Sequence, residues 1–330
     1  MATYLVPEDS RGLINDDRVG KCVNLSLLLG RYVPQEAITN NLNWRPNDKG
    51  DKRKYRDGWL QEVVCQQFDL GRNSAWQTLL KAQYARWQQR TQGAARFTAR
   101  SLGRLIVGLG GKGPMEFGLT VQHVCGLPII PGSALKGLTR AYALLTIAAQ
   151  FNISLLNSKE LNEGKLSSHL DLLDAALAGV KEDREKMWGE LLHAVSKLDR
   201  KGLEDDPAAR AYAEVFGSQD AAGTCVFFDA VIAGVEGLPK QGKLFKVDVM
   251  TPHFNSYYQG NGAPHDAEYP VPVPFLTVTH GVTFAFAVAA RKGHTPPLDT
   301  VTGWLQAALN ELGIGAKTAA GYGVFNVLPK

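Results

Sequence analysis

The sequence of 330 residues has few cysteines and no long apolar run. Its four cysteines are far apart, and none belongs to a CxxC pair: Cys22, Cys65, Cys125 and Cys225. This spacing argues against a disulfide scaffold or a zinc ribbon and favours reduced thiols. No segment approaches the roughly 20 consecutive apolar residues of a membrane span, and the first residues lack the basic and apolar regions of a secretory signal. We therefore expect a soluble, cytoplasmic protein that holds no metal or cofactor.

Acidic residues are missing from a long part of the chain, although the net charge is only +4. None occurs between Asp69 and Glu116, where eight basic residues fall: Arg72, Lys81, Arg86, Arg90, Arg96, Arg100, Arg104 and Lys112. A second acid-free stretch, from Glu116 to Glu160, contains Lys136 and Arg140. Stretches of one sign create a positive potential that suits a polyanion such as a nucleic acid. For residues 72–104 alone, a solvated helix face explains the charges equally well.

The hydrophobic pattern predicts an α+β fold whose N-terminal region, residues 1–95, is mainly helical. Apolar spacing predicts helices over residues 24–29 and 76–90, and the polar, Gly- and Pro-punctuated segment near 43–58 is expected to be a mobile loop. Residues 151–215 have the pattern of a helical insertion. The Pro- and aromatic-rich loop 253–274 is longer than a simple connection needs, so we expect it to be functional or disordered.

The remaining pattern, over residues 96–330, alternates strands with two helices. Strands are expected at 97–109, 117–124, 224–232, 244–249, 275–278, 282–288 and 322–327. One helix is expected to begin near Ser133. The other covers residues 301–312, with Thr300 as its N-cap and Gly313 as its C′ glycine. A β-α-β ending preceded by mixed strands indicates a ferredoxin-like core.

Two glycine-rich loops carry the most distinctive local pattern. Residues 108–113 match G-x-G-x-x-G, but Pro114 leads into a β-patterned segment and no acid follows about 20 residues on, so the sequence argues against a dinucleotide site. Residues 313–323 contain Lys317-Thr318 but lead into a strand, unlike a P-loop. Both loops remain suited to an anion, because glycines let backbone N–H groups approach it closely. Two tight turns with no ligand are the alternative.

The segment 131–140 reads Pro-Gly-Ser-Ala-Leu-Lys-Gly-Leu-Thr-Arg. With Ser133 as the expected cap, Lys136 falls at the third helical position, and Arg140 follows four residues later on a shared face. A cation near the positive end of a helix opposes the dipole. A lysine at this position, beside exposed backbone amides, is therefore well placed to bind an anionic ligand. Ordinary surface charge is the alternative.

These segments together resemble the signature of the RAMP superfamily, the repeat-associated RNA-binding proteins of CRISPR systems. The glycine-rich stretch 108–118 with Glu116, the helix start 131–140 and the loop 313–323 occur in the order of the family pattern. Segments 24–32, 223–230, 248–258 and 270–275 resemble in particular the sixth RAMP subunit of the type III-B (Cmr) effector complex. Ala134, Ala319 and Ala320 depart from the family pattern, which has serine at the first position and often Ser or Arg at the others.

The resemblance implies a modified ferredoxin-like (RRM-like) core in a non-catalytic subunit of antiviral defence. Such a subunit binds guide RNA near its 3′ end and helps to position target RNA for cleavage by another subunit. The implied partners are guide RNA, target RNA and the other RAMP and small subunits of the complex, with no membrane. The expected RNA-binding residues lie on the two glycine loops and the helix start: Gly110, Gly111, Lys112, Ser133, Lys136, Arg140, Gly315, Lys317, Thr318, Gly321 and Tyr322. Four residues of the aromatic loop are expected either to stack bases or to form a subunit interface: His253, Phe254, Tyr257 and Tyr258.

The alternative function is a metal-independent RAMP endoribonuclease in which a histidine acts as general acid or base. The candidates by residue type are His123, His253, His265 and His280, because imidazole titrates near neutral pH. No second acid–base partner is recognisable at a useful spacing, so the sequence favours a binding protein. Asp229 and Asp248 lie within or beside strands and are expected to orient loops.

Overall fold

The computed structural model describes residues 22, 24–33, 59–65, 68, 74–110, 118–154, 169–195, 197–238, 242–251, 257, 260, 262–263 and 273–329. The expected mobile loop near 43–58 lies outside these residues, and so does most of the loop 253–274. Within the described ranges, no helix is both long and apolar enough to cross a bilayer.

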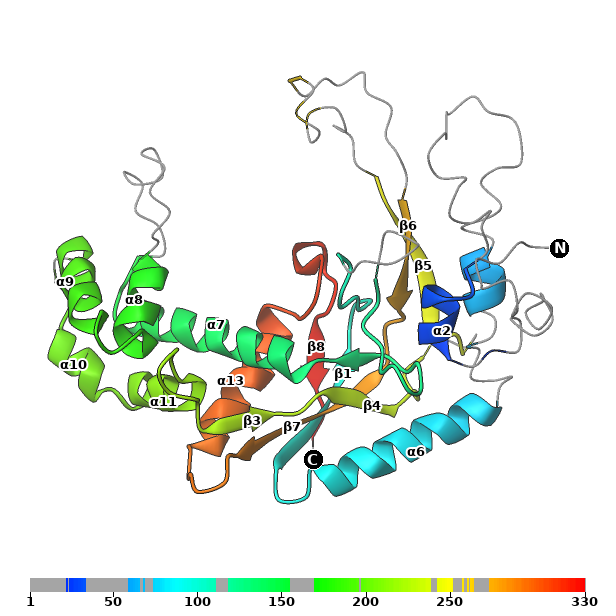
Figure 1. Ribbon diagram of the computed structural model, residues 1–330, viewed down its shortest axis with the longest axis horizontal. Helices are drawn as coiled ribbons and strands as arrows, with labels where there is room; N and C mark the ends of the chain where they lie inside the picture. The colour runs from blue at the N-terminus through cyan, green and yellow to red at the C-terminus, as the bar shows by residue number, and fades with distance from the viewer. Residues whose placement is uncertain are drawn as a thin grey trace.

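An antiparallel sheet forms the centre of the fold (Figure 1). Its strands are β1 (Ala95–Ser101), β2 (Ile129–Ile130), β3 (Cys225–Phe227), β4 (Ala230–Gly234), β7 (Thr283–Ala290) and β8 (Phe325–Val327). They follow the order β2-β4-β7-β1-β8, and β3 pairs with the far end of β7. Two further strands, β5 (Phe245–Met250) and β6 (Val273–Val278), form a separate antiparallel pair.

The connectivity of the central elements is that of a ferredoxin-like core. Along the chain they run β1, α7 (Gly132–Gln150), β4, β7, α13 (Leu298–Glu311) and β8. In the sheet, β8 lies beside β1, which lies beside β7, which lies beside β4. This is the β-α-β-β-α-β arrangement expected from the sequence. The α+β prediction is confirmed.

The two faces of the sheet carry different helices, as the alternation along β7 requires. Phe284 and Phe286 point into the main core with α7 and α13. There α13 buries one face made of Val301, Trp304, Leu305, Ala308 and Leu309. Ala285 and Ala287 point to the other face, where they form a small cluster with Trp87 of α6 (Ser74–Arg90). In Figure 1, α6 lies below the sheet, away from α7 and the helices that follow it.

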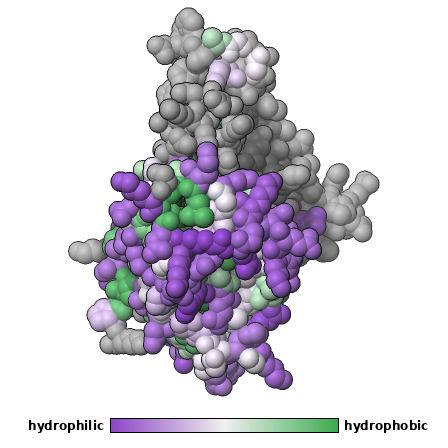
Figure 2. Space-filling view, turned by 90° about the vertical axis from the view of Figure 1, so that its left-hand side faces the viewer, coloured by the Kyte–Doolittle hydropathy of each residue, from purple (hydrophilic) through white to green (hydrophobic). Residues whose placement is uncertain are grey.

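The described residues between α7 and β3 are mainly helical, which agrees with the pattern of residues 151–215. The helices there are α8 (His169–Ala178), α9 (Arg184–Ala194), α10 (Arg200–Asp205) and α11 (Pro207–Phe216). They gather at one end of the molecule, where Figure 2 shows a mainly hydrophilic face with a hydrophobic patch. Near the N-terminus, α2 (Leu25–Gly30) and a π-helical segment (Trp59–Val64) precede α6. Asn24 caps α2 by accepting a hydrogen bond from the N–H of Leu27.

Several expected strands are shorter or broken. The strand expected at 97–109 ends at Ser101, because the chain there leaves the regular ladder and pairs with the loop before β8. No strand forms in the described part of 117–124, where Val121 makes one isolated bridge to Pro128. The strand expected at 224–232 is two strands, β3 and β4, separated by Phe228 and Asp229.

Both expected N-caps are wrong. The helix α7 begins at Gly132 with Pro131 as its N-cap, so Ser133 lies within the first turn. The helix α13 begins at Leu298 after Pro297, so Thr300 is a helical residue. In each case proline precedes the expected cap and its fixed φ angle starts the helix earlier. The expected C′ glycine is confirmed, because Gly313 has φ +71° and its N–H donates to the carbonyl of Ala308.

Candidate nucleic-acid interface

The glycine loop 313–323 lies directly against the segment that follows β1. Three backbone hydrogen bonds join them: the N–H of Leu102 donates to Val324, that of Gly323 to Arg104, and that of Ala316 to Ile106, each at 2.8 Å. The chain then continues into the first glycine loop, where the N–H of Thr120 donates to Val107 at 2.7 Å. The fold therefore brings the start of the first glycine loop, of which residues 108–110 are described, beside the second loop, although the loops are about 200 residues apart in sequence. We call this common surface the edge.

The glycines of this edge fall into two kinds. A Cβ at Gly315 would lie 2.2 Å from the carbonyl oxygen of Ile106, and a Cβ at Gly323 would lie 1.9 Å from that of Ile314. These two positions serve internal packing. In contrast, an added Cβ at Gly110 or Gly321 would meet no atom of the described residues within 4 Å, and both glycines are exposed. Gly315 is exposed as well, so Gly110, Gly315 and Gly321 each leave backbone that an RNA strand could approach, whereas Gly323 is buried.

Sequence reasoning missed Gly103, which belongs to the same contact. A Cβ there would lie 2.1 Å from the carbonyl oxygen of Gly321. The only signal in the sequence was a glycine inside a segment with a strand pattern, which marks a close approach of another backbone. The partner of that approach is visible only in the tertiary structure.

Two side chains of the loop are held by the β5–β6 pair. The ammonium of Lys317 lies 5.2 Å from the ring centroid of Phe275, within cation–π range. The hydroxyl of Tyr322 donates to the carboxylate of Asp248, which also binds the guanidinium of Arg104. Asp248 thus orients the loop, as its position beside a strand predicts. Lys317, Thr318 and Tyr322 are half-buried, so part of each remains accessible at this edge.

The ion pair at Asp248 shifts the titration of this carboxyl. Burial raises its pKa, but hydrogen bonds from Tyr322 and the backbone of Val249, together with the Arg104 charge, lower the pKa below its usual value overall. A depressed carboxyl pKa means that the native state is stabilised by the charged form. This contribution is fully present above the unfolded-state pKa of about 4 and is lost as the pH falls through the lower folded-state pKa.

Asp248→Asn is therefore expected to lower the free energy of unfolding by about 1–2 kcal/mol at pH 7, because Arg104 loses its partner. Denaturant unfolding between pH 7 and pH 3 measures the effect, and the gap between wild type and variant should narrow below about pH 4. Asp205→Asn is the matched control, since Asp205 and Arg210 are more than half exposed, and its cost should stay below about 0.5 kcal/mol. A gap that does not change with pH would show that the charge of Asp248 does not stabilise the loop.

The first turn of α7 is already occupied by a carboxylate. The N–H of Gly132 donates to Oδ1 of Asp229 at 2.7 Å, so Asp229 orients the β3–β4 turn, as expected, and satisfies one amide of the helix start. Ser133 is exposed and Lys136 is half-buried beside this turn. Burial, with the nearby Arg140 charge, lowers the pKa of Lys136. That these two residues contact RNA stays a prediction.

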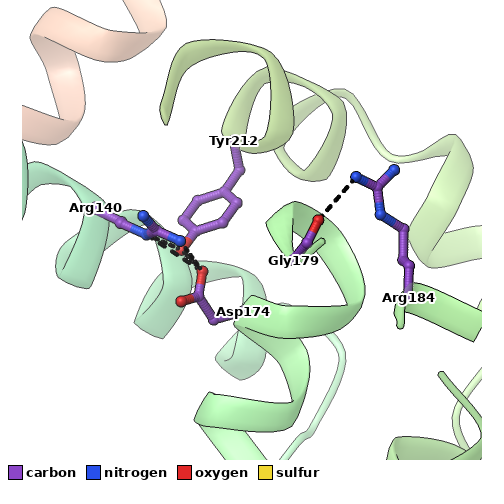
Figure 3. A network of polar contacts seen from close by, with 5 residues as sticks. All are labelled: Arg140, Asp174, Gly179, Arg184 and Tyr212. Atoms are coloured by element: carbon purple, nitrogen blue, oxygen red, sulfur yellow. Dashed lines mark hydrogen bonds and ion pairs between the residues drawn. The ribbon is translucent and has the colours of Figure 1, made fainter. Parts of the chain in front are cut away.

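Arg140 has a clear structural role. Its guanidinium donates to Oδ1 of Asp174 in α8 at 2.7 Å and to the hydroxyl of Tyr212 in α11 at 3.0 Å. The Tyr212 hydroxyl also donates to Asp174, and Figure 3 shows the three side chains converging from three helices. Burial and the Asp174 carboxylate raise the pKa of Tyr212. Arg140 therefore joins α7 to the helical insertion, and an RNA contact by this residue stays a prediction.

Several of the expected site residues lie outside the described part of the chain: Gly111, Lys112, His253, Phe254, Tyr258 and His265. Tyr257 is described and is 51% exposed. His280 is exposed, and the ring of the exposed His123 lies 3.0 Å from the Ser26 hydroxyl, where it ties α2 to the turn before β2. Among the described residues no group of three His, Cys, Asp or Glu side chains could hold a metal ion.

Comparison with known proteins places this geometry in a family. The chain is 31% identical over 227 residues to the CRISPR system Cmr subunit Cmr6 of Pyrococcus furiosus, an alignment that covers 67% of this chain and 64% of the relative. It resembles the crystal structure of Cmr6 from Pyrococcus furiosus at 28% identity and a TM-score of 0.44, covering 70% of this chain and 97% of that one. A cryo-EM structure titled as the type III-B Cmr-beta bound to cognate target RNA matches at 18% identity and a TM-score of 0.49, over 89% of this chain and 85% of that one. The family model described as the RAMP superfamily matches residues 98–326, which include both glycine loops and α7. The chain belongs to the RAMP superfamily.

Proposed function

We propose that this protein is an RNA-binding structural subunit of a type III-B CRISPR RNA-guided complex. In this function it binds guide RNA near its 3′ end and helps to position target RNA for cleavage by another subunit in antiviral defence. The observation that carries the proposal is the convergence of both RAMP glycine loops at one edge, in a chain that is 31% identical to a Cmr6 subunit. The relative's name describes a complex subunit, which supports the other RAMP and small subunits as partners.

The chemistry of the edge suits a ribose–phosphate backbone. Gly110 and Gly321 are open to solvent, so a strand can come close to their backbone N–H groups. Lys317 supplies a cation that Phe275 holds in place. Contacts to the ribose–phosphate backbone do not read the base sequence. A subunit that accepts guides of varied sequence requires contacts of this kind.

A binding role, with cleavage left to another subunit, fits the surroundings of His123. Acid–base cleavage of RNA needs two groups within hydrogen-bond reach of the reacting atoms. The partner of His123 is a serine hydroxyl of α2, and a serine is no second acid–base group. We therefore extend the proposal to a subunit without catalytic residues of its own.

Gly110→Asp tests the edge directly. The purified full chain is titrated with a labelled single-stranded, repeat-derived RNA, and the dissociation constant is measured by fluorescence anisotropy at several salt concentrations. Since a carboxylate opposes phosphate at close range, the affinity should fall about tenfold. An added side chain at Gly110 has free space, so the melting temperature should be unchanged. Gly189→Asp, in α9 with equally free space, adds the same charge away from the edge and should bind RNA like wild type.

Equal affinities of Gly110→Asp and Gly189→Asp would contradict RNA binding at this edge. The same preparations are incubated with the RNA in the presence and absence of divalent metal, and the products are separated on a denaturing gel. Specific cleavage that His123→Ala or His253→Ala abolishes would replace the binding role with the ribonuclease alternative.

A further inference from the structure

A second candidate site lies on the face of the sheet that carries α6, between α6 and the β3–β4 turn. A groove of about 260 Å³ opens there, beside the small cluster that Trp87 forms with Val231. The indole N–H of Trp87 donates to the backbone carbonyl of Asp229 at 2.9 Å, which fixes the floor of the groove. Figure 1 shows α6 apart from α7 and α13, and no residue of α7 or α13 lines the groove.

The rim of the groove is positively charged. Arg86 and Arg90 are exposed, lie four residues apart on α6 and line the groove. Neither forms an ion pair with the described part of the chain, in contrast to the paired Arg104, Arg140 and Arg200. Because α6 itself contains no acidic residue, nothing on the helix neutralises this face. Unpaired guanidinium groups beside a groove are suited to phosphate groups.

The interior of the groove is suited to a nucleobase. Phe228 offers a half-buried ring, and Asp229 offers a carboxylate among the lining residues. The amide of Gln122 also lines the groove, and its Oε1 accepts hydrogen bonds from Gln83 and Cys125. Gln83 also lines the groove; it is 4% exposed, and its Oε1 has no hydrogen-bond partner among the residues that the structure describes. Aromatic rings flanked by arginines bind single-stranded nucleic acid by stacking bases and contacting phosphates. The single carboxylate, Asp229, is committed through Oδ1 to the start of α7, which reduces its repulsion of a phosphate.

We propose that this α6 groove is a second binding site for single-stranded RNA, separate from the glycine loops. Arg86 and Arg90 contact successive phosphates, and a base enters the groove beside Phe228. The inference rests on the proposed RNA-binding function and adds to it a surface on the opposite face of the sheet. It also explains why the acid-free stretch of the sequence extends over α6, where no glycine loop lies.

The test is the double variant Arg86→Ala/Arg90→Ala in the full chain. An oligouridylate is titrated at several salt concentrations. The dissociation constant should rise about tenfold, and the magnitude of the slope of log affinity against log salt should decrease by about 1.4, the value for two lost phosphate contacts on a single strand. Lys197→Ala/Lys201→Ala is the matched control. It removes two exposed lysines four residues apart in the insertion, and it should leave both quantities unchanged.

Three results would overturn the inference, and only the second of them also overturns the proposed function. If Gly110→Asp weakens binding but the α6 double variant matches wild type, the glycine-loop site stands and the α6 site does not. If the wild-type chain binds no RNA, both fail. If polyglutamate of equal charge displaces the oligouridylate from wild type as effectively as unlabelled RNA does, the groove is a general anion-binding surface that suits an acidic protein. Loss of affinity in the α6 variant with normal binding by its control supports the inference, whatever Gly110→Asp shows.

Discussion

Replacing Gly323 with alanine is expected to lower the free energy of unfolding by about 3 kcal/mol. Gly323 has φ +67°, a left-handed conformation that costs a residue with a Cβ about 1–2 kcal/mol. The new Cβ would also lie 1.9 Å from the carbonyl oxygen of Ile314, so the backbone of the loop must shift. The N–H of Ile314 donates to the Gly323 carbonyl at 2.9 Å, and this bond closes the loop. Urea unfolding followed by circular dichroism measures the loss.

Gly137→Ala is the matched control, with an effect of the opposite sign. Gly137 lies inside α7, has ordinary helical geometry, and an added Cβ meets nothing within 4 Å. Alanine there should stabilise the protein by about 0.5–1 kcal/mol, the difference in helix propensity. If Gly323→Ala unfolds at the same urea concentration as wild type, the close approach of Gly323 to Ile314 does not constrain the loop in the way described here.

Asp174→Ala is expected to cost about 2 kcal/mol and to loosen the helical insertion from α7. The Arg140 and Asp174 side chains are 35% and 34% exposed, so solvent screens their ion pair and reduces its contribution. Most of the loss comes from Tyr212, which is fully buried and would keep its hydroxyl without its carboxylate acceptor. Hydrogen exchange should show weaker protection in α8 and α11 than in the central sheet.

The control for this prediction is Glu190→Ala, which removes another carboxylate of the insertion. Glu190 pairs with Lys186 at 3.9 Å on the surface of α9, with both side chains largely exposed. Its loss should change the stability by less than about 0.5 kcal/mol. If Asp174→Ala costs no more than Glu190→Ala, the Arg140 network does not attach the insertion.

The elements with strong periodicity could be predicted from the sequence. The helices α6, α7 and α13 and the strand β7 lie close to their expected positions, because a helix or strand that buries one face must repeat its apolar residues at the matching spacing. The short pieces could not be placed as well. Residues 224–232 read as one strand, yet Phe228 and Asp229 divide it, since Asp229 turns to meet the first amide of α7.

The candidate site also has features that the sequence predicts and features that only the tertiary structure shows. The sequence alone shows the composition and order of the glycine loops and the absence of acidic residues around them. These features can be read from the sequence because glycine acts through local backbone freedom and charge acts through the net potential. Only the tertiary structure decided which glycines are free. It places Gly315 and Gly323 against other backbone and leaves Gly110 and Gly321 open. It also gave Arg140 a partner in Asp174, because contacts between distant segments depend on how the helices pack and cannot be read from spacing along the chain.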